Sequence, residues 1–320
     1  MLKLYLLIIG CVIGAAVLLT LSISYAIYRM AFYTNRKKHI KLFDKLEGEL
    51  DENKKYRRAL IEKMIAEPCE DVYIQSHDGL KLHGRLYRRD KDAPLSIMMH
   101  GYKSISLRDM SGGGKEALAL GHNLLLVDQR AHGESEGRVI SFGINERYDA
   151  LGWVDFGIRE FGPDVKIILT GISMGAGTVL MASELGLPKN VVGICADCPF
   201  STPVEIIKKV GRDMKMPAGI LTPFIIIAAR LFGGFSINAA SSIEAVKNTD
   251  IPILLIHSKE DKFVPIEMSD KIAECGRTVE YIVFPEGGHG MSYIFDTEKY
   301  VYNLKKFINS VTENDKGEKL

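Results

Sequence analysis

The fold of this 320-residue chain is decided by the stretch Gly171-Ile172-Ser173-Met174-Gly175. The apolar run before it, Val165–Thr170, is typical of a buried strand, and the run after it, Ala176–Leu185, is typical of a helix packed on a sheet. A serine at so sharp a strand-to-helix turn has a strained backbone, and flanking glycines let the turn close. The stretch therefore predicts a nucleophile, Ser173, whose hydroxyl projects out of the sheet, with a purely structural Gly/Ser turn as the alternative.

The alternation of apolar strands and helices continues on both sides of this turn. A hairpin is predicted around Asp78-Gly79, between Val72–Gln75 and Leu80–Tyr87. The other predicted strands are Leu95–Met99, Asn123–Val127, Val165–Thr170, Val191–Ala196, Ile251–His257 and Val279–Phe284. Predicted helices lie near 112–121, 145–161, 174–186, 266–275 and 297–311. Continuous apolar strands separated by helices predict an α/β fold with a mostly parallel, doubly wound sheet that is covered on both faces.

A nucleophilic serine needs a base, and the base needs a carboxylate that orients it. In doubly wound enzymes with this turn, the acid and then the histidine follow the serine along the chain. His289 lies between two glycines after the last predicted strand and is the candidate base, with an ordinary surface histidine as the alternative. Asp261 follows the strand Ile251–His257 and is the candidate acid, with Glu260 and Asp197 as alternatives.

An acyl-transfer intermediate also needs backbone N–H donors for its oxyanion. One donor is expected at Met174, directly after the nucleophile, and the other at Tyr102, in the loop after Leu95–Met99. The run Gly112-Gly113-Gly114-Lys115 lacks the spacing of a phosphate-binding loop, and we expect it to give flexibility to a loop near the oxyanion donors.

Taken together, these motifs resemble the α/β-hydrolase superfamily, and more narrowly its serine-aminopeptidase-like and esterase branch. The resemblance covers about residues 70–312 and is carried by His100-Gly101-Tyr102, Asp128-Gln129-Arg130-Ala131-His132-Gly133-Glu134-Ser135-Glu136-Gly137, Gly171–Gly175, Asp261 and Gly288-His289. It implies the α/β-hydrolase fold and a Ser-His-Asp triad. Within the second motif, Asp128 and Arg130 are expected to shape a turn, and His132 is not expected to be a second base.

An apolar segment precedes this domain. The run Leu4–Tyr28, residue 4 to residue 28, has 25 residues and no charge, more than the roughly 20 that span a bilayer core. It predicts a transmembrane anchor within residues 1–35, with a cleaved signal peptide or a buried helix as alternatives. Basic residues at Arg29 and Arg36-Lys37-Lys38 place the following domain in the cytoplasm by the positive-inside rule, with an extracytoplasmic placement as the alternative.

The remaining boundaries follow from composition. Residues 36–68 form a charged, amphipathic connector that either lies on the membrane or packs on the domain. The domain spans 69–312, and its segment of about 200–245 has no predicted strand, so we expect a small helical cap there. Residues 313–320 are a polar tail. An anchor followed by such a domain resembles a bacterial group of membrane-linked hydrolases.

The composition excludes some classes of function. A formal net charge of +1 argues against nucleic-acid binding, and five cysteines without regular spacing predict no disulfide framework. No metal, nucleotide or flavin motif is present, so no cofactor is expected. The sequence does not predict an oligomeric state.

The predicted activity is that of a membrane-anchored serine hydrolase that cleaves a carboxylic ester or thioester. The apolar cap residues of Pro217–Phe235 either pack on the domain or form an acyl pocket or a lid that meets the bilayer, so a small-molecule or lipid-like ester is the expected substrate. A serine aminopeptidase is the alternative, but its acidic amine-binding groups would be limited to Glu205, Asp213 and Glu244 in the cap. A non-catalytic, membrane-tethered binding protein would not need the complete triad.

Overall fold

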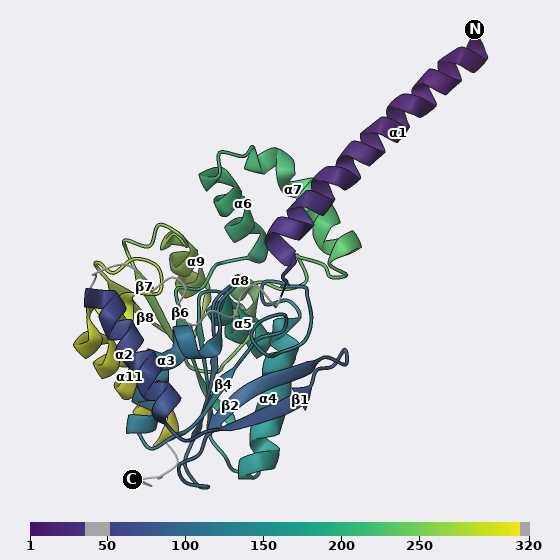
Figure 1. Cartoon of the computed structure of the whole chain (residues 1–320). Coiled ribbons are helices and arrows are strands. Elements are labelled where there is room, and N and C mark those ends of the chain that lie inside the picture. Colours follow the sequence, from purple (N-terminus) through teal and green to yellow (C-terminus); the bar gives the residue numbers. More distant parts are fainter. Residues whose placement is uncertain (36–51, 314–320) are drawn as a thin grey trace.

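The computed structural model describes residues 1–35 and 52–313, and its centre is an eight-stranded sheet (Figure 1). The strand order is β1-β2-β4-β3-β5-β6-β7-β8. The strands are β1 (Glu70–Gln75), β2 (Lys81–Tyr87), β3 (Leu95–Met99), β4 (Asn123–Val127), β5 (Ile167–Ile172), β6 (Val191–Asp197), β7 (Ile253–Ser258) and β8 (Val279–Phe284). β1 and β2 form the predicted antiparallel hairpin, β2 runs antiparallel to β4, and all other neighbours are parallel. The predicted mostly parallel sheet is confirmed.

Helices cover both faces of this sheet, as expected for strands that are apolar throughout. One face packs on α4 (Glu146–Phe161), α5 (Met174–Ala182) with the 3₁₀ turn η3 (Ser183–Leu185), α8 (Ser242–Lys247) and α9 (Glu267–Cys275). The other face packs on α2 (Glu52–Ala66), α3 (Ser106–Ala119), α10 (Ser292–Phe295) and α11 (Thr297–Thr312). Trp153 of α4 is among the largest fully buried side chains, at the centre of the first layer.

The charged connector packs on the domain along its described part. Leu60, Ile61 and Met64 on one side of α2 are buried, and α2 lies against α3. The helix ends at Ala66, before Pro68, as the sequence predicts. The rest of the predicted connector, residues 36–51, lies outside the described residues.

The glycine run Gly112–Gly114 lies inside α3, so the prediction of a flexible loop is wrong. A Cβ at Gly112 would lie 2.7 Å from the Tyr293 ring, and one at Gly114 would lie 3.1 Å from Leu124 Cδ2. The absence of side chains lets α3 pack closely on α10 and on the sheet. Close packing explains these glycines better than backbone freedom does.

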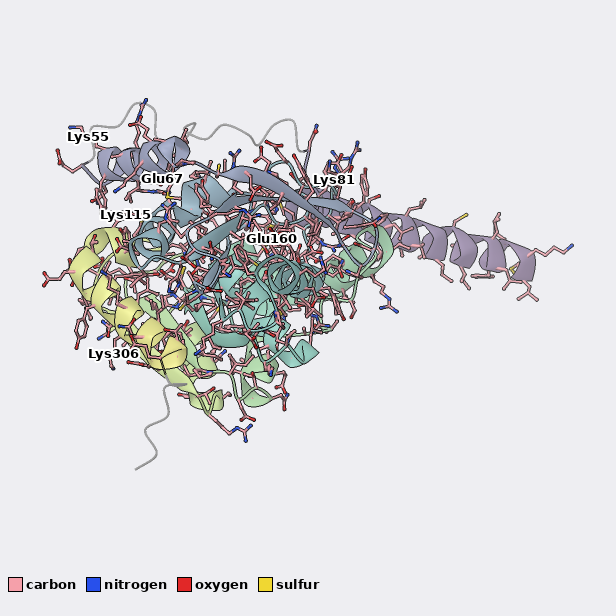
Figure 2. The ribbon with its side chains drawn as sticks, turned by 90° about the horizontal axis from the view of Figure 1, so that it is seen from below. Lys55, Glu67, Lys81, Lys115, Glu160 and Lys306 are labelled. Carbon is pink, nitrogen blue, oxygen red and sulfur yellow. The ribbon has the colours of Figure 1, made fainter. Side chains whose placement is uncertain are left out.

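The N-terminal segment is the long helix α1 (Leu2–Ile27), which continues into the π-helical turn η1 (Tyr28–Phe32). Together they are long and apolar enough to cross a membrane, and the apolar window has no buried residue. Figure 1 shows α1 projecting away from the sheet. In Figure 2 the labelled charged residues all lie on the globular part. This exposed apolar surface is what a membrane-spanning helix presents to lipid.

The segment between β6 and β7 forms the helices near the base of α1. They are α6 (Pro203–Asp213), α7 (Ala218–Ile227) and the π-helical turn η4 (Ala228–Phe232), and they are followed by α8, which packs on the sheet face described above. α7 lies beside α1, as Figure 1 shows, and the rings of Tyr25 and Tyr28 contact Phe232, with centroids 5.3 and 5.9 Å apart. α7 therefore packs against the base of the candidate anchor, and α6 packs against α7.

Candidate active site

Ser173 occupies the sharp turn between β5 and α5. Its φ of 55° and ψ of −115° are unusual for a residue with a side chain, and its N–H donates to the Asp197 carbonyl at 2.8 Å. A Cβ at Gly175 would lie 2.1 Å from the Met99 carbonyl oxygen, and one at Gly171 would lie 2.2 Å from the Gly175 oxygen. The two flanking glycines are therefore needed to close the turn.

The structure brings the three predicted catalytic side chains together. The Nε2 atom of His289 lies 2.9 Å from Ser173 Oγ, and its Nδ1 atom lies 2.7 Å from Asp261 Oδ2. Because a carboxylate only accepts hydrogen bonds, Nδ1–H donates to Asp261 and Nε2 is left to accept the serine proton. Each residue follows the end of a different parallel strand, so the sheet edge assembles the group.

The Asp261 carboxylate is held by several donors. Its Oδ1 accepts the N–H groups of Phe263 and Val264 at 2.9 and 2.8 Å, and its Oδ2 also lies 3.2 Å from His257 Nε2. Burial raises the pKa of Asp261, but hydrogen bonds from His257 and His289 more than offset it and hold the pKa below its usual range. Asp261 therefore stays ionised at neutral pH and can stabilise a protonated imidazole.

His257 is a supporting residue that the sequence analysis missed. This fully buried side chain lies one residue before the end of β7, where its Nδ1 lies 2.6 Å from the Ser269 hydroxyl and its Nε2 lies 2.9 Å from the Val264 carbonyl. The carbonyl requires Nε2 to carry the proton, so the same N–H points toward Asp261. The sequence did contain a signal for this supporting role: a histidine stands four residues before the predicted acid, after an apolar run of the strand.

Neither alternative acid has this geometry. Glu260 is exposed, and Asp197 accepts a hydrogen bond from the Tyr300 hydroxyl at 3.0 Å. Burial raises the pKa of Asp197 to about 6. Among the described contacts, neither carboxylate bonds to His289, so the geometry selects Asp261.

The predicted oxyanion donors lie on either side of the serine. Met174 is the first residue of α5, and the first N–H groups of a helix have no acceptor within it. In the loop after β3, the Gly101 N–H donates to Asp109 and the Lys103 N–H donates to His132 Nε2, both at 3.0 Å. Between them the Tyr102 N–H donates to no residue in the described ranges. Both predicted donors are therefore available to a ligand.

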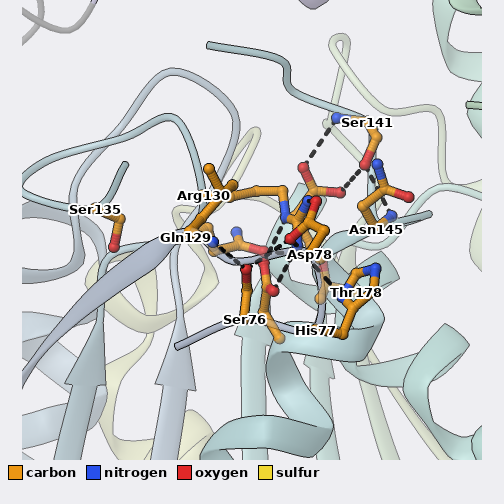
Figure 3. Close-up of polar contacts among 12 residues, drawn as sticks. Ser76, His77, Asp78, Gln129, Arg130, Ser135, Ser141, Asn145 and Thr178 are labelled. Carbon is orange, nitrogen blue, oxygen red and sulfur yellow. Dashed lines mark hydrogen bonds and ion pairs between the residues drawn. The ribbon is translucent and has the colours of Figure 1, made fainter. Parts of the chain in front are cut away.

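A polar network around Arg130 joins the loop of the hairpin to the segment after β4 (Figure 3). Arg130 forms two hydrogen bonds to Asp149 at 2.6 and 2.7 Å and two to Asp78 at 2.8 and 3.1 Å. The Gln129 amide donates to the His100 carbonyl at 2.6 Å, directly before the oxyanion loop. Bidentate arginine pairs impose a defined geometry, so this network holds the hairpin, α4 and the loop in register.

The remaining polar groups of the Asp128–Gly137 motif are also structural. Asp128 accepts from the Ser106 hydroxyl at 2.9 Å and lies 2.9 Å from His83 Nδ1. His132 lies 2.9 Å from the Arg130 carbonyl through Nδ1, and its Nε2 accepts from the oxyanion loop. Asp128 and Arg130 thus shape turns, as the sequence predicts, and His132 supports the loop rather than a proton transfer.

One group near the triad could be mistaken for a metal site. The ligand atoms of Cys198, Asp261 and His289 lie within 4.8 Å of one another. Burial raises the pKa of the Cys198 thiol well above its usual value. Asp261 and His289 already bond to each other, and the cluster is part of the triad.

Two cavities reach Ser173. One, of about 330 Å³, extends between α2, α3 and α11 and includes polar residues such as Arg57, Arg108 and Asp109 in its lining. The other, of about 250 Å³, lies under α6 and α7 and has a mainly apolar lining. The serine can therefore meet one mainly apolar and one more polar part of a ligand.

No family model matches this chain. The chain is 27% identical over 199 residues to YqkD, an uncharacterised protein of Bacillus subtilis, and the match covers 62% of this chain and 65% of YqkD. It is 32% identical over 133 residues to the thiohydrolase aneE of Aspergillus aculeatus, covering 41% of each chain. It is 24% identical over 259 residues to the lysophosphatidylserine lipase ABHD12 of Danio rerio, covering 77% of this chain and 62% of that protein.

Among solved structures, the chain is similar to the Pyrococcus furiosus esterase Pf2001, with a TM-score of 0.61 and 24% identity. The similarity covers 78% of this chain and 95% of the esterase. Those of the relatives described here whose names state an activity are hydrolases, which supports a hydrolase activity. The strand order, the serine turn and these similarities lead to one conclusion: this chain has the fold of the α/β hydrolases.

Proposed function

We propose that this protein is a serine hydrolase that cleaves a carboxylic ester or thioester through an acyl-enzyme. The observation that carries the proposal is the hydrogen-bonded series Ser173–His289–Asp261 at the strand edge. His289 takes the serine proton as Oγ attacks the acyl carbon, and the N–H groups of Tyr102 and Met174 stabilise the oxyanion. The histidine then protonates the departing alcohol or thiol, and water, activated by the same histidine, releases the acid.

The cap favours esters over peptides. A peptidase that releases N-terminal residues needs a free carboxylate for the substrate amine, but Glu205 pairs with Lys271 at 3.2 Å and Asp213 pairs with Lys209 at 2.5 Å. The third acidic candidate of the cap, Glu244, pairs with a lysine of its own helix. The apolar cavity instead suits an apolar acyl group, and the names of the relatives, an esterase, a lipase and a thiohydrolase, support acyl hydrolysis.

Active-site labelling followed by a substrate panel tests this proposal. We expect a fluorophosphonate probe to label the full-length protein at Ser173. We also expect p-nitrophenyl esters to be hydrolysed at least about 100-fold faster than aminoacyl amides, measured as kcat/KM, because the cap lacks an amine site. A faster amide reaction would favour the peptidase. Absence of both labelling and ester hydrolysis would favour a binding protein.

We further propose that α1 is an uncleaved anchor and that the catalytic domain is cytoplasmic. The N-terminal side carries only Lys3 and the amine, whereas Arg29 and the basic run 36–38 follow the apolar segment. In intact cells, a C-terminal tag should therefore resist a membrane-impermeant reagent until the membrane is permeabilised. Labelling of the tag from outside would contradict this orientation.

A further inference from the structure

The end of the candidate anchor forms part of the wall of the apolar cavity beside Ser173. Ile27, Met30 and Ala31 line this cavity, and Leu221 and Ile225 of α7 line it as well. The remaining wall comes from α6 and from loops at the sheet edge. The cavity is thus closed partly by the domain and partly by a segment whose composition suits a bilayer.

This wall is joined to the catalytic machinery by hydrogen bonds. The Tyr102 hydroxyl donates to the Ala31 carbonyl at 2.7 Å, and Lys103 Nζ donates to the Met30 carbonyl at 3.0 Å. Phe32 is fully buried directly after these residues. Because the same loop carries the candidate oxyanion donor, the anchor is fixed against the site and does not behave as a loose tether.

The length of the anchor places this wall near the membrane surface. Its 31 residues span about 46 Å at ~1.5 Å per residue, whereas a bilayer hydrocarbon core is about 30 Å thick. Because Arg29 is the first charged residue after the apolar run, we place the last turns, from Arg29 to Phe32, in the headgroup region on the side of the domain. α7 lies beside them, contains no charged residue, and leaves Ile220 and Ile226 exposed.

The cavity also has its mouth at this level. Met30 and Met214 both line the cavity and are 45% and 54% exposed, so the opening lies between the end of the anchor and α6. Exposed apolar side chains around an opening are unfavourable in water and favourable against acyl chains. Contact of this opening with lipid is therefore more favourable than its contact with water.

We propose that this cavity receives the acyl chain of a lipid ester directly from the membrane leaflet around the anchor, with the last turns of the anchor as one wall. The proposal rests on the serine hydrolase function proposed above and adds the source of the substrate. The chain enters between α1 and α6, and the ester carbonyl then meets Ser173. The more polar cavity on the other side of the serine is left for the alcohol part.

A pair of blocking variants tests the cavity in full-length protein reconstituted into phosphatidylcholine vesicles. Leu221→Trp and Met30→Trp should each lower kcat/KM for p-nitrophenyl dodecanoate at least about tenfold, because indole fills the space of the chain. Hydrolysis of p-nitrophenyl butyrate should change less than about threefold, because a short chain needs little of the cavity.

Two matched tryptophan variants serve as controls. Ile220→Trp is the neighbouring position on α7, 69% exposed and outside the cavity, and Leu18→Trp is on the anchor, 67% exposed. Both should keep wild-type rates on both esters. The inference is wrong if the blocking variants keep the wild-type kcat/KM for the dodecanoate ester. It is also wrong if kcat/KM falls equally for both esters while fluorophosphonate still labels Ser173. Failure of wild-type labelling and of butyrate hydrolysis would instead overturn the proposed function itself.

A second experiment tests whether the substrate comes from the protein's own membrane or from solution. Monooleoylglycerol is placed either in the vesicles that hold the protein or in separate protein-free vesicles at the same total concentration. We expect at least about tenfold faster initial release of oleate from the shared vesicles, since the cavity mouth opens to the protein's own leaflet. Equal initial rates in the two arrangements would show uptake from solution and overturn the proposal.

Discussion

Replacing Ser173 by alanine should lower kcat/KM for short p-nitrophenyl esters by at least about 10⁴-fold. The substitution removes the hydroxyl that lies 2.9 Å from His289 Nε2, so the acyl-enzyme can no longer form on residue 173. The fold should be unchanged, because alanine fits the same turn and the serine side chain bonds only to His289 among the contacts described. The measurement is steady-state hydrolysis together with fluorophosphonate labelling, which should disappear.

Ser183 provides a matched control for this variant. It is a buried serine just beyond the C-terminal end of α5, and its hydroxyl donates to the Leu180 carbonyl at 2.7 Å rather than to a residue of the triad. Ser183→Ala should retain both labelling and hydrolysis. Ester hydrolysis by folded Ser173→Ala at more than about 1% of the wild-type rate would refute the nucleophile assignment.

The second large effect is expected for Asp261→Asn, which should lower kcat by about 10³- to 10⁴-fold with little change in KM. Asparagine keeps the volume but removes the negative charge that stabilises protonated His289. Its side chain can also turn an N–H group toward Nδ1, which favours the wrong imidazole tautomer. The N–H groups of Phe263 and Val264 would still find a carbonyl oxygen, so the loop should remain folded, as circular dichroism can check.

Asp197, the buried alternative to Asp261 as the acid, provides the control for the loss of negative charge. Asp197→Asn should keep kcat within about threefold of wild type, since Asp197 does not orient His289 in the described structure. A large loss here, with activity retained in Asp261→Asn, would reverse the assignment of the acid.

The stability of Asp197→Asn relative to wild type should also depend on pH in a defined direction. The folded pKa of Asp197, about 6, exceeds the usual carboxyl value near 4, so the folded state binds the proton more tightly than the unfolded state does. The contribution of Asp197 to wild-type stability should therefore fall as pH rises from about 4 through 6, by on the order of 2 to 3 kcal/mol. Asparagine does not titrate, so Tm of the variant minus that of wild type should increase between pH 5 and pH 8.

Much of the sheet and the choice of triad residues could be predicted because their signals are local. The strand–serine–helix pattern around Ser173 depends on a few adjacent residues, and the chain order of acid and histidine led to Asp261 and His289. The structure places these three within hydrogen-bonding distance. Their roles in catalysis stay predictions until the variants are measured.

Other features depend on contacts between distant segments and could not be predicted. Gly112 of α3 is explained by Tyr293, which lies 181 positions later, and no local pattern reveals that contact. His257 gains its role only through the turn that brings Asp261 back over β7. The contact of Tyr102 with Ala31 joins segments whose patterns indicate separate units, an anchor and a domain.

That last contact changes which substitutions the anchor can tolerate. In an ordinary tether, one apolar residue replaces another with little effect, because lipid places few demands on shape. At Met30 and Ala31 the side chains shape a cavity, while the backbone carbonyls hold the loop of Tyr102 and Lys103. Under the proposed function, substitutions in this short segment are therefore constrained by the candidate active site as well as by hydrophobicity, because the candidate membrane segment and the candidate site share these residues.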